Sequence, residues 1–221
     1  TLSSSSAASD VYKRQILCVL RSHKLIMNDT VILIPSHLRA TRLPNKPLLL
    51  INNKPMIVHC WQRAIESKVG EVYVATADEE IAEVIKNAGG KSILTSKEHK
   101  TGSDRIFEAI EKNFSNKPKN IINLQGDMPN IDPSAIKLLD KFMENNSYQI
   151  ATLATKLNSK KDLENKNIVK VETSEKIPMN SFIKALDFFR LQNINESKFC
   201  YHHVGILSLI HISEPTRRTP I

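Results

Sequence analysis

Short apolar segments alternate along most of this chain with segments that carry a helical period. Residues 30–35 read TVILIP and residues 71–76 read EVYVAT, and each is an apolar run of the kind that forms a buried parallel strand. Between them, residues 56–68 place apolar side chains at helical spacing. Because parallel strands need long crossover connections, which helices commonly supply, the alternation predicts an α/β fold. We expect a three-layer α/β/α sandwich around a mostly parallel sheet.

The same alternation continues further along the chain. Asp78 stands where it can cap a helix that ends at the glycine pair 89–90. Ser103 can cap a second helix that runs to about residue 113, and Asp132 followed by Pro133 opens a third that runs to about residue 145. The remaining predicted strands are residues 91–95, 119–124, 149–155 and 168–172.

Glycine is scarce, and this limits how the chain can bind phosphate. Only six glycines occur in 221 residues, and no arrangement of them makes the dinucleotide fingerprint G-x-G-x-x-G or the Walker A loop. Lys and Arg number 31 against 23 Asp and Glu, which gives a formal charge of +8. If the protein binds phosphates, side-chain cations and a metal ion have to hold them.

Composition also argues against several classes of protein. The three cysteines are widely spaced with no C-x-x-C, which indicates buried thiols in a reducing cytoplasm instead of a disulfide framework or a zinc knuckle. No apolar run approaches the roughly 18 residues of a membrane span, so we expect no membrane association. A nucleic-acid-binding module is the alternative that the basic charge raises. It is disfavoured because no basic stripe is interleaved with aromatic side chains, and we expect no nucleic-acid partner.

The two ends of the chain differ in composition from the middle. Residues 1–26 include SSSSAASDVYKRQ, and residues 207–221 include LSLIHISEPTRR; both resemble translated sequencing-adapter sequence. We therefore expect a natural start at Met27, a natural sequence that stops near Ile206, and one incomplete domain over residues 27–206. The alternative is a genuine disordered tail at each end.

Three loops combine unusual chemistry with a position after a predicted strand or before a predicted helix. Arg39, Arg42 and Lys46 follow the first strand, and these cations suit a polyphosphate. Asp127 follows the strand at 119–124 directly after a glycine, where a carboxylate suits Mg²⁺ that carries substrate phosphates. Residues 99–105, HKTGSDR, add hydroxyls and a helix start. Because ligands of open α/β sheets bind beyond the carboxyl ends of the strands, these loops form the candidate site.

Together these loops match the pattern of a known family. IPSHLRATRLPNKPL resembles the signature IPARxxSxRLPxKPL of the 3-deoxy-manno-octulosonate (Kdo) cytidylyltransferases, or CMP-Kdo synthetases. The segments INNKPMIVHCWQRA, VYVATADEEI, HKTGSDR, NLQGDMP, IATLAT, NIVKV and YHHVGI then come in that family's order. The resemblance covers about 180 residues, from Met27 to Ile206, and implies a nucleotide-diphospho-sugar transferase-like fold.

The resemblance also implies a reaction and a set of site residues. In the family, the anomeric hydroxyl of Kdo attacks the α-phosphate of CTP to give CMP-Kdo and pyrophosphate for lipopolysaccharide biosynthesis, in the cytoplasm and in a homodimer. Carried over by motif, Arg42 and Lys46 would hold the triphosphate and Asp127 would bind Mg²⁺. The cytidine site would be lined by Ala75, Thr76, Thr101, Gly102 and Gln125, and the Kdo side by Arg190 and His203.

Two departures from the family pattern lower the activity we expect. His37 stands where the family signature has its first arginine, which removes one permanently charged phosphate contact. The family's later G-x-D-T-x-x-D segment, which supplies a second metal-binding aspartate, does not occur, so we expect little or no turnover from this chain. Two alternatives stay open at this point: a related cytidylyltransferase for another acidic sugar, and a non-catalytic nucleotide-binding fragment.

Overall fold

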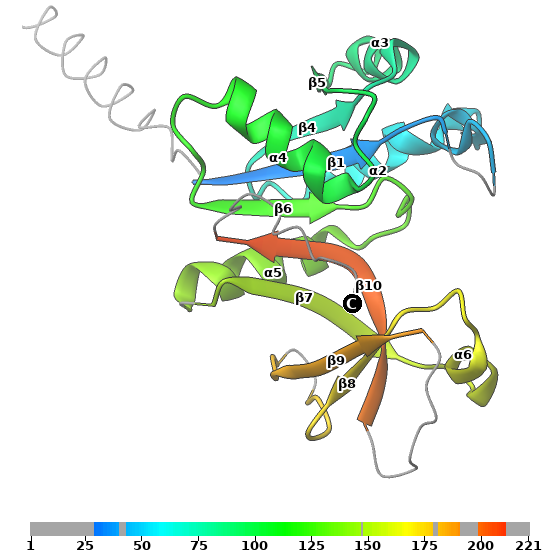
Figure 1. The fold of residues 1–221 in the computed structure, drawn as a ribbon, viewed down its shortest axis with the longest axis vertical. Coiled ribbons are helices and arrows are strands. Elements are labelled where there is room, and N and C mark those ends of the chain that lie inside the picture. Colours follow the sequence, from blue (N-terminus) through cyan, green and yellow to red (C-terminus); the bar gives the residue numbers. More distant parts are fainter. Residues whose placement is uncertain (1–28, 40–42, 147, 179–180, 191–198, 211–221) are drawn as a thin grey trace, which may run out of the picture.

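Eight strands form one mixed sheet in the computed structural model, which describes residues 29–39, 43–146, 148–178, 181–190 and 199–210 (Figure 1). The strands are β1 (Thr30–Ser36), β4 (Glu71–Thr76), β5 (Lys91–Leu94), β6 (Asn120–Leu124), β7 (Ile150–Lys156), β8 (Lys170–Thr173), β9 (Ala185–Phe189) and β10 (Phe199–Leu209). Their order is β5-β4-β1-β6-β10-β8-β9, and β7 also pairs with β10. A separate two-stranded sheet joins β2 (Leu50–Ile51) to β3 (Lys54–Pro55).

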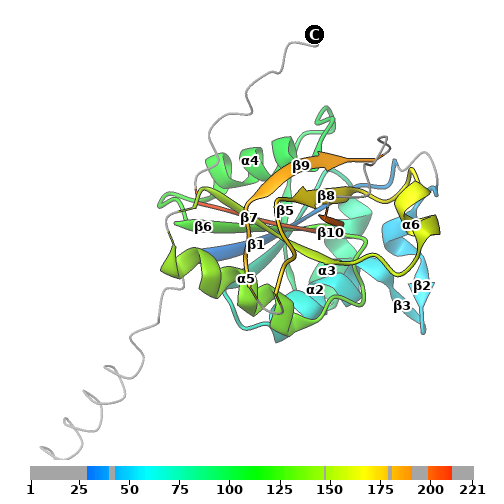
Figure 2. The same ribbon diagram turned by 90° about the horizontal axis from the view of Figure 1, so that it is seen from below.

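Helices cover both faces of the parallel part of the sheet. The helices are η1 (Lys46–Leu48, a 3-10 turn), α2 (Met56–Glu66), α3 (Glu79–Asn87), α4 (Gly102–Asn113), α5 (Pro133–Asn145) and α6 (Lys160–Glu164), and those that cover the parallel strands are α2 to α5. Figure 2 shows α4 on one face and α2, α3 and α5 on the other, which confirms the α/β/α sandwich. None of the helices in the described ranges is both long and apolar enough to span a membrane.

The alternation of side chains along β1 explains this layering. Ile32 and Ile34 point into the larger core cluster, which α2, α3 and α5 complete, whereas Val31 and Leu33 point into the cluster that α4 completes. Successive side chains of a strand face opposite sides of the sheet, so a strand that is apolar at every position has to be covered twice. The continuous apolar run TVILIP therefore dictates a three-layer structure.

The parallel strands lie on both sides of β1. Strand β1 pairs in parallel with β4 on one side and with β6 on the other, and β4 pairs in parallel with β5. The chain moves outward from β1 through β4 to β5 and then returns, through α4 on the opposite face, to β6. Strand order reverses between β1 and β6, and ligands of such sheets bind at the carboxyl ends beside that reversal.

An antiparallel half extends the sheet beyond β6. Strand β10 pairs antiparallel with β6, β7 and β8, and its register with β7 shifts between Val204 and Leu207. In Figure 1, β10 runs from beside β6 down to β8 and β9 and so joins the two halves. Neither β9 nor β10 was predicted as a strand. Strand β10 also continues three residues past Ile206, to Leu209, with Ser208 buried opposite Ile122.

Two predicted helix caps differ from what the structure contains. The cap of α4 is Thr101, whose hydroxyl oxygen accepts the N–H of Asp104 at 3.1 Å, so the prediction of Ser103 was wrong by two residues. Asp78 does precede α3, but its carboxylate makes no capping bond and accepts the N–H of Leu38 at 2.9 Å instead. In the first case the helix begins earlier than expected, and in the second a nearby loop provides the side chain with another partner.

A buried carboxylate ties α5 to the amino ends of the central strands. Asp140 is 8% exposed, and its Oδ1 accepts bonds from the Thr30 hydroxyl at 2.8 Å and from Asn120 Nδ2 at 3.0 Å. Ser208 donates in turn to Asn120 Oδ1 at 2.6 Å, which adds β10 to the network. Burial raises the pKa of Asp140 above its ordinary value of 3.8, although the two hydrogen bonds oppose the rise.

We expect the substitution Asp140→Asn to raise the free energy of unfolding at neutral pH. A raised folded-state pKa means that the native protein binds this proton more tightly than the unfolded chain, so Asp140 costs stability increasingly as pH rises from about 3.8 through the folded-state value. The Asn oxygen can keep both acceptor bonds without the charge. Urea denaturation over a pH series checks this: the gain over the parent should grow with pH in that window. A variant that is less stable than the parent throughout this window would show that the hydrogen bonds to the carboxylate outweigh the cost of burying its charge.

Candidate active site

An ion pair joins the loops that follow β1 and β6. Lys46 begins η1, directly after Asn45 in the left-handed conformation at φ 56°, and its Nζ donates to Asp127 Oδ2 at 2.9 Å. The lysine side chain is 35% exposed and the aspartate 47%, so both remain open to a ligand. The two residues lie 81 positions apart in sequence. The structure therefore brings together the cation and the carboxylate that the sequence placed after different strands.

Gly126 allows this loop to approach β1. A Cβ at residue 126 would lie 3.0 Å from the Pro35 carbonyl oxygen and 3.2 Å from Ile57 Cδ1. The first contact is with backbone, which cannot move aside without displacing the end of β1. A side chain here would push the loop, and Asp127 with it, away from the end of β1.

The thiol beneath the ion pair is not a nucleophile. Cys60 on α2 is completely buried, and burial raises its pKa to about 12, with the negative charge of Asp127 adding to the rise. Only the thiolate reacts readily, and at neutral pH this group stays protonated. The prediction of buried free thiols is confirmed for Cys60, whereas Cys200 is only partly buried and Cys18 lies outside the described residues.

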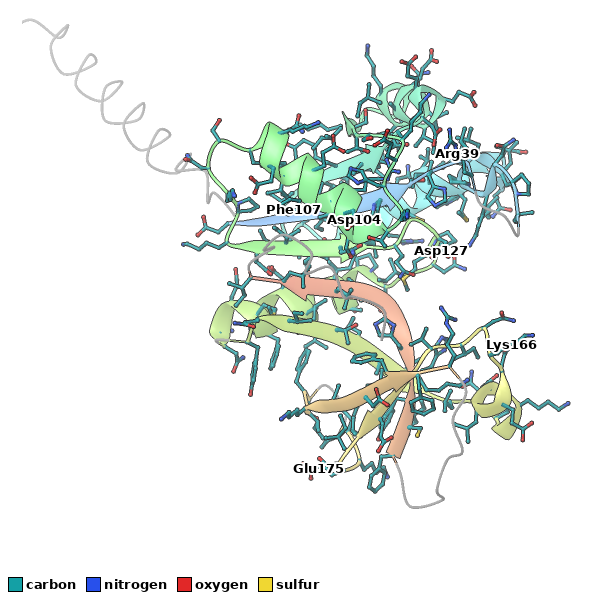
Figure 3. The ribbon with its side chains drawn as sticks, in the orientation of Figure 1. Arg39, Asp104, Phe107, Asp127, Lys166 and Glu175 are labelled. Carbon is teal, nitrogen blue, oxygen red and sulfur yellow. The ribbon has the colours of Figure 1, made fainter. Side chains whose placement is uncertain are left out.

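The N-terminus of α4 meets the same end of β1. A Cβ on Gly102 would lie 3.1 Å from Pro35 Cγ, so Gly102 and Gly126 both pack against Pro35. In Figure 3, Asp104 in the first turn of α4, Asp127 and Arg39 all lie toward the carboxyl end of the parallel strands, whereas Lys166 and Glu175 lie in the antiparallel half. The three predicted loops thus surround one end of β1.

The residues predicted to line a cytidine site divide into two groups. Thr101, Gly102 and Gln125 are exposed at this edge, and the backbone N–H of Gln125 donates to the Gly205 carbonyl at 3.1 Å. Ala75 and Thr76 are fully buried, and the Thr76 hydroxyl accepts the N–H of Asp78 at 3.1 Å. The buried pair therefore offers no surface that is open to a ligand.

The predicted phosphate loop is only partly described. Arg42 lies outside the described residues, and its contact with phosphate stays a prediction. His37 and Arg39 are both exposed beyond the end of β1. Lys46 is therefore the predicted phosphate contact whose surroundings the structure defines.

His203 lies on β10 in a half-buried, polar and aromatic setting. Its Nε2 is hydrogen-bonded to the Thr152 hydroxyl at 2.8 Å, and the Phe188 ring packs edge-on at 5.5 Å between ring centres. Burial lowers the pKa of His203 below 6.5, and the adjacent His202 adds to the effect. The imidazole is therefore neutral near neutral pH.

Arg190 and a lysine that sequence reasoning missed hold the turn before β8. The Arg190 guanidinium donates to the carbonyls of Lys166 at 3.4 Å and Asn167 at 3.1 Å. Lys170 is fully buried, and its Nζ donates to the carbonyls of Asn165 and Arg190, both at 2.6 Å. The available signal was a lysine between two valines inside a predicted strand, because a charge in that position needs a buried partner.

The carboxylate at this site suits a divalent cation that arrives with phosphate. Within the described ranges, no group of three or more His, Cys, Asp and Glu side chains is placed to hold a metal ion. Asp127 offers a single carboxylate beside a cationic lysine. Mg²⁺ is commonly held by one or two carboxylates together with substrate phosphates, so the residues present fit Mg²⁺ of that kind and not a preformed metal cage.

Comparison with known proteins agrees with this geometry. The model of the cytidylyltransferase family matches residues 31–208. The 3-deoxy-manno-octulosonate cytidylyltransferase of Nitrobacter winogradskyi is 40% identical over 180 residues, which are 81% of this chain and 70% of that protein. The corresponding protein of Brucella ovis is 40% identical over 178 residues, which are 80% of this chain and 70% of that protein.

A solved structure supports the same assignment. The structure of CMP:2-keto-3-deoxy-manno-octonic acid synthetase complexed with CTP superimposes with a TM-score of 0.69 at 35% identity and covers 82% of this chain and 73% of its own. Similarity at this level extends through both the parallel and the antiparallel halves of the sheet, because the family match ends inside β10. By sequence and by fold, the chain belongs to the cytidylyltransferase family and is a relative of the 3-deoxy-manno-octulosonate cytidylyltransferases.

Proposed function

We propose that this protein transfers a cytidylyl group from CTP to Kdo, giving CMP-Kdo and pyrophosphate. The observation that carries the proposal is the Lys46–Asp127 pair at the point where strand order reverses. A cation for the triphosphate and a carboxylate for Mg²⁺ stand side by side there. The similarity to cytidylyltransferases that act on Kdo supports the choice of both substrates.

The reaction needs positioning and charge neutralisation more than a covalent enzyme nucleophile. The anomeric oxygen of Kdo bonds to the α-phosphorus of CTP, the bond from that phosphorus to the bridging oxygen of pyrophosphate breaks, and the hydroxyl proton passes to solvent water. Lys46 and Arg42 would bind the triphosphate and stabilise the departing pyrophosphate. Asp127 would hold Mg²⁺, which when bound neutralises phosphate charge.

The two substrates would approach from different halves of the sheet. Thr101, Gly102 and Gln125 would contact the cytidine above Ala75 and Thr76. Arg190 would supply charge for the Kdo carboxylate, while the neutral His203 would supply a polar contact. Gln125 bonds to Gly205, two residues from His203, and this links the base side to the sugar side.

Nucleotide and sugar preference together test the proposal. We expect calorimetry to show that the chain binds CTP in the presence of Mg²⁺ more tightly than UTP. Any pyrophosphate release, however slow, should require Kdo and should fall when Kdo is replaced by sialate. A sialate preference would favour the related cytidylyltransferase for another acidic sugar, and CTP binding with no detectable binding of Kdo would favour the non-catalytic nucleotide-binding fragment. Equal binding of CTP and UTP would contradict the proposal.

Mg²⁺ dependence and the homodimer belong to the same proposal. Titration with Mg²⁺ at fixed CTP measures the first, and sedimentation velocity measures the second. If the protein is a monomer that still binds CTP, the proposed homodimer is wrong and nucleotide recognition does not require it.

A further inference from the structure

The loop between β5 and α4 lacks regular structure, yet it delivers the residues proposed to face the base. Residues 95–101 leave β5 at Thr95, whose N–H donates to the Thr76 carbonyl at 2.8 Å, and end at Thr101, the cap of α4. No strand ladder runs along this segment in the described structure. Its position therefore depends on contacts with neighbouring side chains.

Arg105 holds the start of the loop from below. The side chain is 4% exposed, and its Nη1 donates to the Thr95 hydroxyl and, at 3.3 Å, to the Ser96 carbonyl. Burial lowers the pKa of Arg105, while the charges of Asp78 and Glu108 oppose that change. The Asp78 carboxylate also accepts the N–H of Leu38, which lies in the loop that follows β1.

Glu108, one turn further along α4, holds the rest of the loop. Its side chain is 12% exposed, and Oε2 accepts the N–H of Ser96 at 2.8 Å and contacts His99 Nε2. Oε1 accepts from Lys112 at 2.6 Å. Burial alone would raise the pKa of Glu108, but the bonds from Lys112, Ser96 and His99 outweigh it and lower the pKa to about 2.

The two contacts of Glu108 Oε2 reach the loop, whereas the contact of Oε1 stays on α4. Lys112 lies on α4 itself at the i,i+4 position, is 68% exposed, and adds only a helix-surface ion pair. Ser96 and His99 instead lie on the loop, on either side of its turn at residues 97–98. A largely buried carboxylate, ionised at neutral pH, binds both ends of this turn and so fixes the path of the chain from residue 96 to the cap at Thr101.

We propose that Glu108 is a positioning residue for base recognition: by holding Ser96 and His99 it sets the place of Thr101 and Gly102 against the cytosine ring. The inference rests on the proposed function, because the base contacts of Thr101 and Gly102 belong to it. Among the described residues, the hydrogen bonds and ion pairs of Glu108 join Ser96, His99 and Lys112, and they include neither Asp127 nor a residue of the loop after β1. Loss of Glu108 should therefore affect recognition of the base and leave recognition of the phosphates intact.

The variant Glu108→Gln separates these two effects, because Gln keeps the shape and removes the charge. We expect its Kd for CTP to rise about tenfold and the preference for CTP over UTP to fall by a similar factor. The Kd for inorganic tripolyphosphate should change less than about twofold, since that probe carries no base. Calorimetry well below the unfolding temperature measures all three values in the folded protein.

Two control variants exclude a purely structural effect. Glu111→Gln removes an exposed carboxylate of α4, which pairs with Lys117. Lys112→Met removes the partner of Glu108 on α4 and leaves the contacts of Glu108 with the loop in place. Both should keep the parental Kd for CTP. If the parent prefers CTP over UTP and the Glu108→Gln variant keeps that preference, the positioning role of Glu108 is wrong and the proposed function stands. Equal weakening of CTP and tripolyphosphate would also overturn the positioning role. A parent that fails to distinguish CTP from UTP would overturn the proposed function as well.

Discussion

Replacing Asp127 with Asn should weaken Mg²⁺-dependent CTP binding at least about tenfold, while CTP binding without Mg²⁺ should stay the same or become tighter. Mg²⁺ holds its water strongly, and the neutral amide oxygen of Asn is a weaker ligand for it than a carboxylate. Without Mg²⁺ the carboxylate repels the triphosphate and also occupies the Lys46 ammonium at 2.9 Å. The substitution removes that repulsion and frees Lys46 for phosphate. Calorimetry with CTP in excess Mg²⁺ and in excess chelator measures both effects.

The chain contains a matched control for this experiment. Asp29 pairs with Lys119 at the opposite ends of the same two strands, just before β1 and β6. Its side chain is 48% exposed, against 47% for Asp127. Asp29→Asn should therefore leave CTP binding unchanged under both conditions. If Asp127→Asn lowers CTP binding equally with and without Mg²⁺, the carboxylate supports the loop and does not hold the metal.

The parallel half of the fold and the central pair of the site could be predicted because they follow from local patterns. Continuous apolar runs identify buried strands, and parallel strands put their carboxyl ends at one edge. Lys46 and Asp127 therefore converge although they are distant in sequence. Their contact is a consequence of topology, and the topology follows from the order of strands and helices.

The antiparallel half could not be predicted in the same way. Strand β9 exposes three of its five residues, and β10 interrupts its alternation with a register shift after Val204 and with Gly205. Strand β9 pairs with β8, the strand directly before it, whereas β10 also pairs with β6, which is distant in sequence. A strand held mainly by its neighbours leaves little periodicity in its own residues.

The hydrogen-bond partners of individual side chains could not be predicted from the sequence either. Ser103 and Thr101 are both good capping residues, and the choice depends on Gly102 packing against Pro35, which starts the helix earlier. Asp78 was predicted as a cap but binds Leu38 because the loop after β1 passes beside it. Such choices depend on which loops meet in space and not on the local sequence.

Lys170→Met should lower the free energy of unfolding by about 2–4 kcal/mol, because a buried charged donor serves two carbonyl groups that would lose their partner. The ammonium is fully buried and bonds at 2.6 Å to the carbonyls of Asn165 and Arg190. Burial lowers the pKa of Lys170 and the charge of Arg190 adds to this, whereas Asp162 opposes it. Met keeps the apolar stem but has no N–H group. Urea denaturation at neutral pH measures the change.

The sign of this prediction is opposite to that for Asp140, and hydrogen bonding explains the difference. At Asp140 the Asn oxygen can still accept from Thr30 and Asn120, so removing the charge leaves the network intact. At Lys170 the donors disappear together with the charge, and the turn at residues 165–167 loses its link to the end of β9. Lys156→Met, on the exposed part of β7, should change stability by less than about 0.5 kcal/mol. If Lys170→Met is equally silent, the two carbonyls find water in its place, and the buried charge does not hold Arg190 in position.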